Sequence, residues 1–466
     1  MTTILKRFIE LLEEALVGNS NRDFTQGSIG VATFLLAVPM ILEMAMESVF
    51  AIVDIFFVSQ LGSDAIATVG LTEAVLTLLY AVAIGLSMGV TAMVARRIGE
   101  KNFSGANLTA GQALWIGLGV SVVVAVSGLI FAEDILLVMG ADQSVIDTGR
   151  TYTSIMFGGC FTILFLFLNN AIFRGAGDAS VAMRSLALAN GINIVLDPCF
   201  IFGWGPFPEM GVTGAAVATN IGRGVGVLYQ LSYLFTAKGR IQVHRSDLGI
   251  RLKIIGELFK ISLGGIAQFL IATASWVIVV RIVATFGTVA VAGYTIAVRI
   301  TIFSFLPAWG LSNTAATLVG QNLGAKLVDR ATKTVLQVAK YNFLYMGLVS
   351  LCFFFFPGQL VSLFTDDAQV LAVGAACLRI LGYGFTAWSV GMVAIQAYNG
   401  AGDTMTPTWI NFVCFWLIEA PLAYVFAIMF GIGETGVFWA VCVSSITFGA
   451  IGCLWFFKGN WKTAQV

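Results

Sequence analysis

A long succession of apolar segments constrains the fold of this chain more than any other feature. Each segment is near or above the roughly 20 residues that an α-helix needs to cross a lipid bilayer. The breaks between them carry glycine, proline and charged residues, which are typical of turns. We therefore predict an all-α integral membrane protein with about twelve transmembrane helices. The segments lie at about 30–58, 66–95, 108–131, 151–173, 182–204, 212–236, 258–286, 290–319, 335–356, 372–397, 406–430 and 436–457.

Composition excludes several classes of protein. Only 11% of the 466 residues are charged, against about 25% in soluble proteins, which again indicates a membrane protein. The net charge of zero argues against a nucleic-acid partner. The 7 cysteines are scattered through apolar segments without a CxxC pair, and the single histidine, His244, falls in a basic loop. We therefore expect no disulfide framework, no cofactor, and neither a serine–histidine hydrolase nor a histidine-ligated metal enzyme.

The distribution of basic residues predicts the orientation in the membrane. With the N-terminus inside, most Lys and Arg fall on the cytoplasmic side, and only Arg150 and Arg379 fall on the outer side. The N-terminus is not a signal peptide, because apolar Leu5 and Phe8 are interleaved with charged residues, as in an amphipathic helix at the membrane surface. We expect a multi-pass protein of the plasma membrane, a bacterial or archaeal inner membrane, with both termini in the cytoplasm.

The chain repeats itself at a constant spacing. Gly99 pairs with Gly324, and the sequence Gly-Ala-Gly-Asp occurs at 175–178 and again, at the same distance along the chain, at 400–403. One constant offset, which we call the repeat spacing, indicates two halves with matching helix and loop lengths. An even number of helices in each half gives both halves the same orientation and places the substrate site between them. The predicted parts are an amphipathic segment 1–27, a first six-helix bundle 28–237 that couples to the cation, a cytoplasmic linker 238–257, a second six-helix bundle 258–457 and a cytoplasmic tail 458–466.

The first apolar segment carries a stripe of acids. Glu43, Glu47 and Asp54 are spaced by four and seven residues, which puts all three on one face of a helix. A charge inside the bilayer costs at least ~2.5 kcal/mol, and such residues are functional by default. Pro39, one turn before Glu43, lacks a backbone donor and clashes with the preceding turn, so we predict a hinge there. A helix that bends and carries an acidic stripe indicates ion-coupled transport.

A second polar group lies toward the outer end of the fifth segment. Asn193 and Asp197 are one turn apart, and Asp197 lies at a depth similar to that of Asp54 in the first segment. Thr219, in the following segment, reaches the same depth. Two carboxylates, an amide and a hydroxyl offer oxygen ligands that suit a hard cation. We predict that Asp54, Asn193, Asp197 and Thr219 bind the coupling ion, which is H⁺ or Na⁺.

The acids also have a purely structural interpretation, in which they hydrogen-bond to neighbouring backbone or hydroxyl groups. A structural role would be expected in both halves, but the second half has no acid at the matching positions, which favours ion coupling by the first half. The structural alternative stays open for Glu43 and Glu47, because either residue could simply face a wet cavity. The counterparts of Glu43, Glu47, Asp54, Asn193 and Asp197 are Gln268, Ala272, Val279, Ile418 and Leu422.

Taken in order, these features resemble the multidrug and toxic compound extrusion (MATE) family over about residues 28–457. The motifs that carry the resemblance are Val53-Asp54 after a helix-1 proline, Gly-Gln-Asn-Leu-Gly-Ala at 320–325, the two Gly-Ala-Gly-Asp turns, and Asn193 with Asp197-Pro198. Their order, the repeat and the number of helices together are quite specific.

The resemblance implies a V-shaped pair of six-helix bundles that exports small amphipathic, often cationic compounds by antiport against H⁺ or Na⁺ through alternating access. It implies that Asp54, Asn193 and Asp197 form a first-half cation site, which Thr219 joins. It also implies that Pro39 is associated with bending. It also implies the branch of the family that relies on first-half acids. We expect a monomer in the lipid bilayer.

Two other functions are compatible with a membrane protein of this kind. A flippase for a lipid-linked precursor would be expected to line its cavity with several Arg or Lys, but only Arg223, Arg281 and Arg299 are intramembrane, and the last two lie near the outer ends. An intramembrane enzyme is disfavoured because the sequence shows no metal-ligand or nucleophile–base grouping. The antiporter is therefore the preferred interpretation, with the flippase as the alternative.

Overall fold

The computed structural model describes residues 2–18, 22–236 and 239–464, and nearly all of them are helical, which confirms the expected all-α class. Residues 1, 19–21, 237–238 and 465–466 of the predicted N-terminal segment, first bundle, linker and tail lie outside the described residues. The helices are α1 (Thr2–Val17), α2 (Ile29–Ser59), α3 (Ser63–Gly99), α4 (Phe103–Val138), α5 (Gln143–Gly158), α6 (Cys160–Ala176), α7 (Ala179–Phe202), α8 (Val212–Phe235), η1 (Arg245–Leu248), α9 (Leu252–Ala284), α10 (Thr288–Gly324), α11 (Val328–Phe355), α12 (Pro357–Ser362), α13 (Ala368–Ala401), α14 (Met405–Asn411), the π-helical η2 (Phe412–Glu419), α15 (Ala420–Tyr424), the π-helical η3 (Val425–Met429), α16 (Glu434–Lys458) and η4 (Asn460–Thr463).

The helix bounds repeat with the spacing seen in the sequence. Both α3 and α10 are 37 residues long, and α10 begins and ends at the repeat spacing from α3. The turns that follow them also match, because Lys101 and Lys326 adopt positive φ angles of 59° and 62°. Such angles are uncommon for residues other than glycine. The repeat therefore extends to the backbone of the turns.

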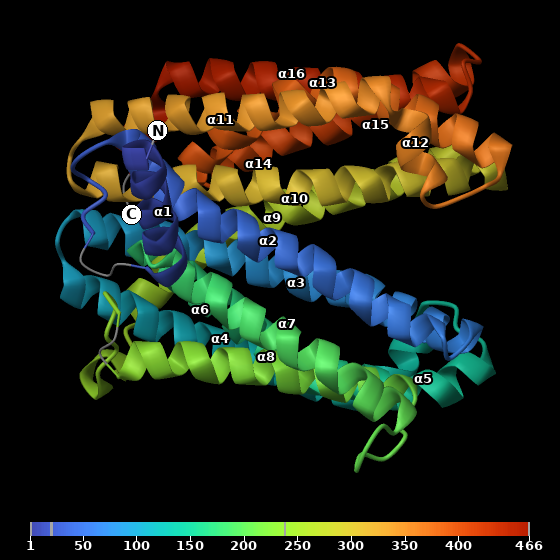
Figure 1. Cartoon of the computed structure of the whole chain (residues 1–466), viewed down its shortest axis with the longest axis horizontal. Coiled ribbons are helices and arrows are strands. Elements are labelled where there is room, and N and C mark those ends of the chain that lie inside the picture. Colours follow the sequence, from blue (N-terminus) through green and yellow to red (C-terminus); the bar gives the residue numbers. More distant parts are fainter. Residues whose placement is uncertain (1, 19–21, 237–238, 465–466) are drawn as a thin grey trace.

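Five hydrophobic cores hold the described helices together, and a smaller one of them joins α2 to α10 and α13. The two largest cores account for most of the buried apolar residues. One core is built from buried residues between Val58 and Ile261, and another from buried residues between Val279 and Phe448. Figure 1 shows α2–α8 and α9–α16 as two groups that diverge toward the end holding α5 and α12 and converge at the end holding both termini. The two groups meet where α3 packs along α9 and α2 packs along α10.

Glycines bring the two groups into contact at the converging end. A Cβ added to Gly99 of α3 would lie 2.0 Å from the carbonyl oxygen of Gln321 on α10. Gly324 of α10 makes the reciprocal contact, since a Cβ there would lie 2.2 Å from the carbonyl oxygen of Arg96 on α3. Both distances are shorter than any van der Waals contact, so only glycine fits. We call this reciprocal contact the glycine seam.

The link between α1 and α2 is held at the same end by cations from both groups. Arg330 of α11 donates hydrogen bonds to the carbonyl oxygens of Phe24, Gln26 and Gly27. Partial burial opposes ionisation of Asp23, but hydrogen bonds from Lys101 and Thr25 outweigh it and lower the pKa of Asp23 to about 2. The link therefore carries a charged carboxylate at neutral pH and joins the two groups of helices.

Eleven helical stretches of the described part are long and apolar enough to cross a membrane, against the expected number of about twelve. The expected span at 212–236 does form a helix, α8, but this helix is not among the eleven. Its sequence includes Thr219, Asn220, Arg223 and Gln230, which lower its hydropathy. Polar side chains on α8 therefore remove it from the count, and each of them makes a hydrogen bond within the first group of helices.

Candidate functional site

Asn193 is the centre of a buried polar group between α7 and α8. Its Nδ2 donates hydrogen bonds to Asp197 Oδ1 at 3.0 Å and to Thr219 Oγ1 at 3.3 Å. Gly222, about one turn from Thr219, allows the close approach, because a Cβ there would lie 2.6 Å from the carbonyl oxygen of Ala189. The structure thus brings together three of the four residues predicted to bind the coupling ion. We call Asn193, Asp197 and Thr219 the α7–α8 polar group.

The α7–α8 polar group is buried but incompletely hydrogen-bonded. Asn193 Oδ1 and Asp197 Oδ2 are buried and accept no hydrogen bond from the described residues. A buried polar atom without a partner costs about 1–3 kcal/mol. Both atoms are acceptors, so a proton or a cation bound between them would remove this cost.

Asp54, the fourth predicted residue, lies on α2, which packs along α7. Its side chain is buried, and its charge is close enough to that of Asp197 for the two to interact. Among the described residues no hydrogen bond joins Asp54 to the α7–α8 polar group. Carboxylate, amide and hydroxyl oxygens are the ligands that hard cations prefer, so the four side chains could hold Na⁺ or a proton.

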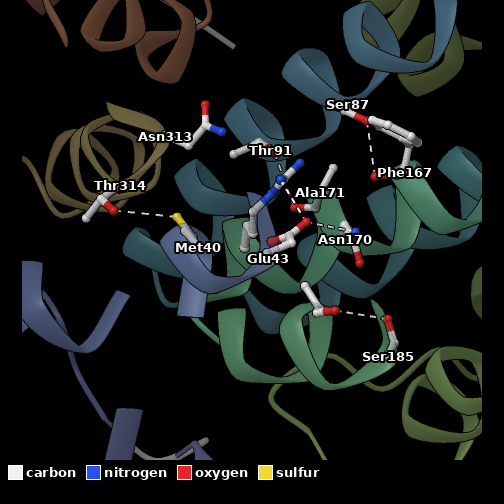
Figure 2. A network of polar contacts seen from close by, with 12 residues as sticks. Met40, Glu43, Ser87, Thr91, Phe167, Asn170, Ala171, Ser185, Asn313 and Thr314 are labelled. Carbon is white, nitrogen blue, oxygen red and sulfur yellow. Dashed lines mark hydrogen bonds and ion pairs between the residues drawn. The ribbon is translucent and has the colours of Figure 1, made fainter. Parts of the chain in front are cut away.

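Glu43, which precedes Glu47 and Asp54 on α2, is held by an ion pair. Asn170 Nδ2 donates to Glu43 Oε1 at 2.8 Å, and Arg174 Nη1 lies 3.2 Å from the same oxygen. Figure 2 shows Glu43 of α2 beside Asn170 of α6, with Asn313 of α10 across from them. Glu43 Oε2 is buried and accepts no hydrogen bond from the described residues. The acid is therefore held through one oxygen only.

Glu47 lies one turn from Glu43 and has a different environment. It accepts no hydrogen bond from the described residues, and the cation whose charge acts on it is Arg223 of α8. Arg223 in turn donates to the Tyr80 hydroxyl at 3.2 Å and also interacts with the charge of Glu73 on α3. Sequence reasoning noted Arg223 only as an intramembrane arginine and missed Glu73 and Tyr80. Glu73 could have been found, because it is an acid within the apolar segment 66–95.

A cavity of about 1040 Å³, its open mouth included, lies between the two groups of helices. Glu43, Glu47 and Arg174 line it from one group, and Asn313, Gln396 and Asn399 line it from the other. We call this space the central cavity, and it lies where the repeat places a substrate site.

Pro39, the predicted hinge, is buried inside α2, which continues on both sides of it. Met40, the next residue, packs against α10. The Thr314 hydroxyl lies 3.5 Å from its sulfur, and a Cβ on Gly310 would lie 2.5 Å from its carbonyl oxygen. Pro39 therefore lies where α2 crosses α10 of the other half of the molecule. Bending at Pro39 stays a prediction.

Comparison with known proteins agrees with this architecture. The family model MatE matches the chain twice, over residues 39–199 and 265–425. The repeat spacing takes Pro39, where the first match begins, to Gly264. The second match therefore begins next to the position that the repeat predicts.

Proteins of known name are similar over most of their length. The chain is 27% identical to a probable multidrug resistance protein, NorM, of Thermotoga maritima, covering 92% of this chain and 93% of that protein. It is also 27% identical to an FAD transporter of Shewanella oneidensis, covering 85% of this chain and 87% of the other. A solved outward-facing structure of a multidrug resistance MATE family transporter superimposes with a TM-score of 0.88 at 26% identity, covering 93% of this chain and 96% of that one.

Proposed function

This chain belongs to the MatE family of membrane transporters, and we propose that it is a secondary active multidrug efflux transporter. It exports amphipathic, often cationic compounds by antiport against H⁺ or Na⁺, as a monomer in the plasma membrane. The observation that carries the coupling is the α7–α8 polar group, in which Asn193 Oδ1 and Asp197 Oδ2 are buried acceptors without a partner. A bound ion would give these two buried oxygens the partner that they lack.

We further propose that the two groups of helices are six-helix bundles, 28–237 and 258–457, that alternate between two orientations. The two largest hydrophobic cores, each mainly within one group, and the double family match support this division. The converging end holds Arg96, Arg97, Lys101, Arg330 and Lys333, and positive residues favour the cytoplasm. The structure then corresponds to an outward-facing state, with the cytoplasmic end closed by the glycine seam. The predicted linker 238–257 joins the bundles on that side.

The lipid-linked flippase is the weaker candidate. An anionic pyrophosphate head group requires cationic side chains that are free to bind it. Arg174 is paired with Glu43, and Arg223 is hydrogen-bonded to Tyr80 and surrounded by acids. The FAD transporter of Shewanella oneidensis shows that a similar chain is named for a large anionic cargo, so FAD belongs among the compounds to be tested.

The proposed function is tested in proteoliposomes loaded with ethidium, a fluorescent organic cation. We expect export when a gradient of H⁺ or of Na⁺, imposed separately, drives ions against the dye, and no export without a gradient. FAD in place of ethidium is the comparison for an anionic cargo. Gradient-driven export of FAD with none of ethidium would replace the multidrug proposal, and export of neither would refute antiport of both.

We expect the topology to follow the basic residues. A reporter that is active only in the cytoplasm should give a signal when it is fused after Lys101, within the loop 239–253 or after Lys462. A reporter that is active only outside should give a signal when it is fused between Glu133 and Asp147. Alkaline phosphatase and green fluorescent protein fusions measure the two sides. An external signal from the loop 239–253 would contradict two halves of equal orientation.

A further inference from the structure

The ion pair of Glu43 and Arg174 has an uncharged counterpart in the second half. The repeat spacing takes Glu43 to Gln268 and Arg174 to Asn399. Gln268 Nε2 donates to Asn399 Oδ1 at 3.1 Å, and Asn399 Nδ2 lies 3.4 Å from Gln268 Oε1. In the first half the pair joins α2 to α6, and in the second half it joins the equivalent helices α9 and α13. The same connection is thus made once with charges and once with amides.

This comparison separates the roles of the acids on α2. The amide pair shows that the connection between the two helices does not require charge. Glu43 and Arg174 also compensate each other, so the pair adds no net charge to the central cavity. The Glu43 pair therefore fixes the shape of the cavity lining, and Oε2 of Glu43 is buried without a hydrogen-bond partner among the described residues.

Glu47 provides the charge that nothing in the cavity lining compensates. The ionisable residues that line the central cavity are Glu43, Glu47 and Arg174, and two acids with one arginine give a net charge of −1 when both carboxylates are ionised. Arg223, the cation whose charge acts on Glu47, is outside the lining, donates to Tyr80 and lies 5.0 Å from the centre of the Phe50 ring. The position equivalent to Glu47 in the second half is Ala272, so the charge is present in one half only.

The rest of the lining suits an organic molecule. Phe167 and Trp309 offer aromatic surface, and Met44 and Met88 offer polarizable apolar surface. Aromatic rings attract cations through their faces, and thioethers adapt to ligands of different shape. The second half adds amides without charge, such as Asn313.

From these observations we propose that Glu47 is the specificity-determining counter-ion of the central cavity, which takes one organic monocation with aromatic surface. The inference rests on the proposed export of organic compounds and identifies the residue that selects them by charge. Glu43 and Arg174 position the cavity floor and contribute little to that selection. A dication is left with one uncompensated charge, and a neutral ligand of the same shape leaves Glu47 without a cationic partner inside the central cavity.

The test is equilibrium binding of tetraphenylphosphonium, an aromatic monocation, to the purified full-length protein in lipid nanodiscs, with neutral triphenylphosphine oxide as the matched ligand. We expect Glu47→Gln to weaken tetraphenylphosphonium binding by at least tenfold, which corresponds to about 1.4 kcal/mol. The same variant should change binding of the neutral ligand by less than threefold. The double variant Glu43→Gln/Arg174→Asn copies the amide pair into the first half. It should weaken tetraphenylphosphonium binding by no more than about threefold.

Glu419→Gln is the control, because Glu419 is also a buried intramembrane acid but lies outside the central cavity. Its cation affinity should equal that of the unmodified protein. Equal tetraphenylphosphonium affinity of Glu47→Gln and the unmodified protein would overturn the inference, as would absence of binding by the unmodified protein. Gradient-driven export of ethidium is measured in parallel, so the proposed function is tested separately from the role of Glu47.

Discussion

Replacement of Asp197 by Asn should abolish gradient-driven export while the protein still folds and inserts. The amide keeps the size of the side chain and can still accept from Asn193 Nδ2, so the contact at 3.0 Å can survive. It removes the negative charge that a proton or Na⁺ would neutralise. A neutral amide is also cheaper than a carboxylate within the bilayer, so loss of stability is not expected. We expect export to fall by at least about tenfold, equivalent to about 1.4 kcal/mol.

Asp54→Asn should have the same effect, and the double variant should be no worse than either single one. Groups that act as a unit are strongly non-additive, because removing one already removes the shared function. Ethidium export is measured under an H⁺ and then an Na⁺ gradient at equal protein amounts, with Glu419→Gln as the control. Robust export by Asp54→Asn under either gradient would contradict the assignment of the ion site. Losses that multiply in the double variant would mean that the two acids act independently.

The physical reason for this expectation lies in the coupling of ion and substrate. A ligand shifts a conformational equilibrium only by the difference between its affinities for the two states. Asp54 is on α2, which packs along α7 on one side and crosses α10 of the other half near Pro39. An ion that joins Asp54 to Asp197 would therefore act on the helix that contacts both halves. This is the shortest route by which the site could influence the orientation of the bundles.

Much of the fold could be predicted from the sequence because a membrane restricts the choice. The lengths of the apolar segments predicted the helices. The constant offset predicted that α3 and α10 would be equally long, and both have 37 residues. Helical spacing likewise anticipated that Asn193 and Asp197 would lie on one face. α8 was expected as a span, but its polar residues make its composition less apolar than that of the eleven other spans.

The partners of the acids could not be predicted in the same way. Spacing defines which residues share a helix face, but it does not define which helix packs against that face or at what height. Glu43 and Arg174 are 131 residues apart, and Arg223 meets Tyr80 across 143 residues. These contacts depend on the packing of α2, α6, α3 and α8. The repeat shows that Gln268 and Asn399 are the counterparts of Glu43 and Arg174, but only the structure shows that each pair is in contact.

The glycine seam leads to the second large effect that we expect, from substitution of either glycine by valine. At Gly99 the new Cβ would lie 2.0 Å from the Gln321 carbonyl oxygen, and at Gly324 it would lie 2.2 Å from that of Arg96. The neighbouring atoms are backbone, so no side chain can turn aside and the two helices must separate. Overpacking of this kind typically costs about 1–3 kcal/mol, and the cost applies only while the converging end is closed. The substitutions should therefore shift the protein toward a state in which that end is open.

A reporter cysteine at Thr317 in a cysteine-free background measures this shift, because Thr317 lines the central cavity and is fully buried. A membrane-impermeant thiol reagent on the cytoplasmic side should label it several times faster in Gly99→Val and Gly324→Val than in the parent protein. Gly70→Val is the matched control, since Gly70 is on α3 as well but has no atom within 4 Å of its added Cβ. Its labelling should be unchanged. The two seam glycines are related by the repeat, so they should act alike. Folded Gly99→Val and Gly324→Val variants that label no faster than Gly70→Val would mean that the glycine seam does not close the cytoplasmic end.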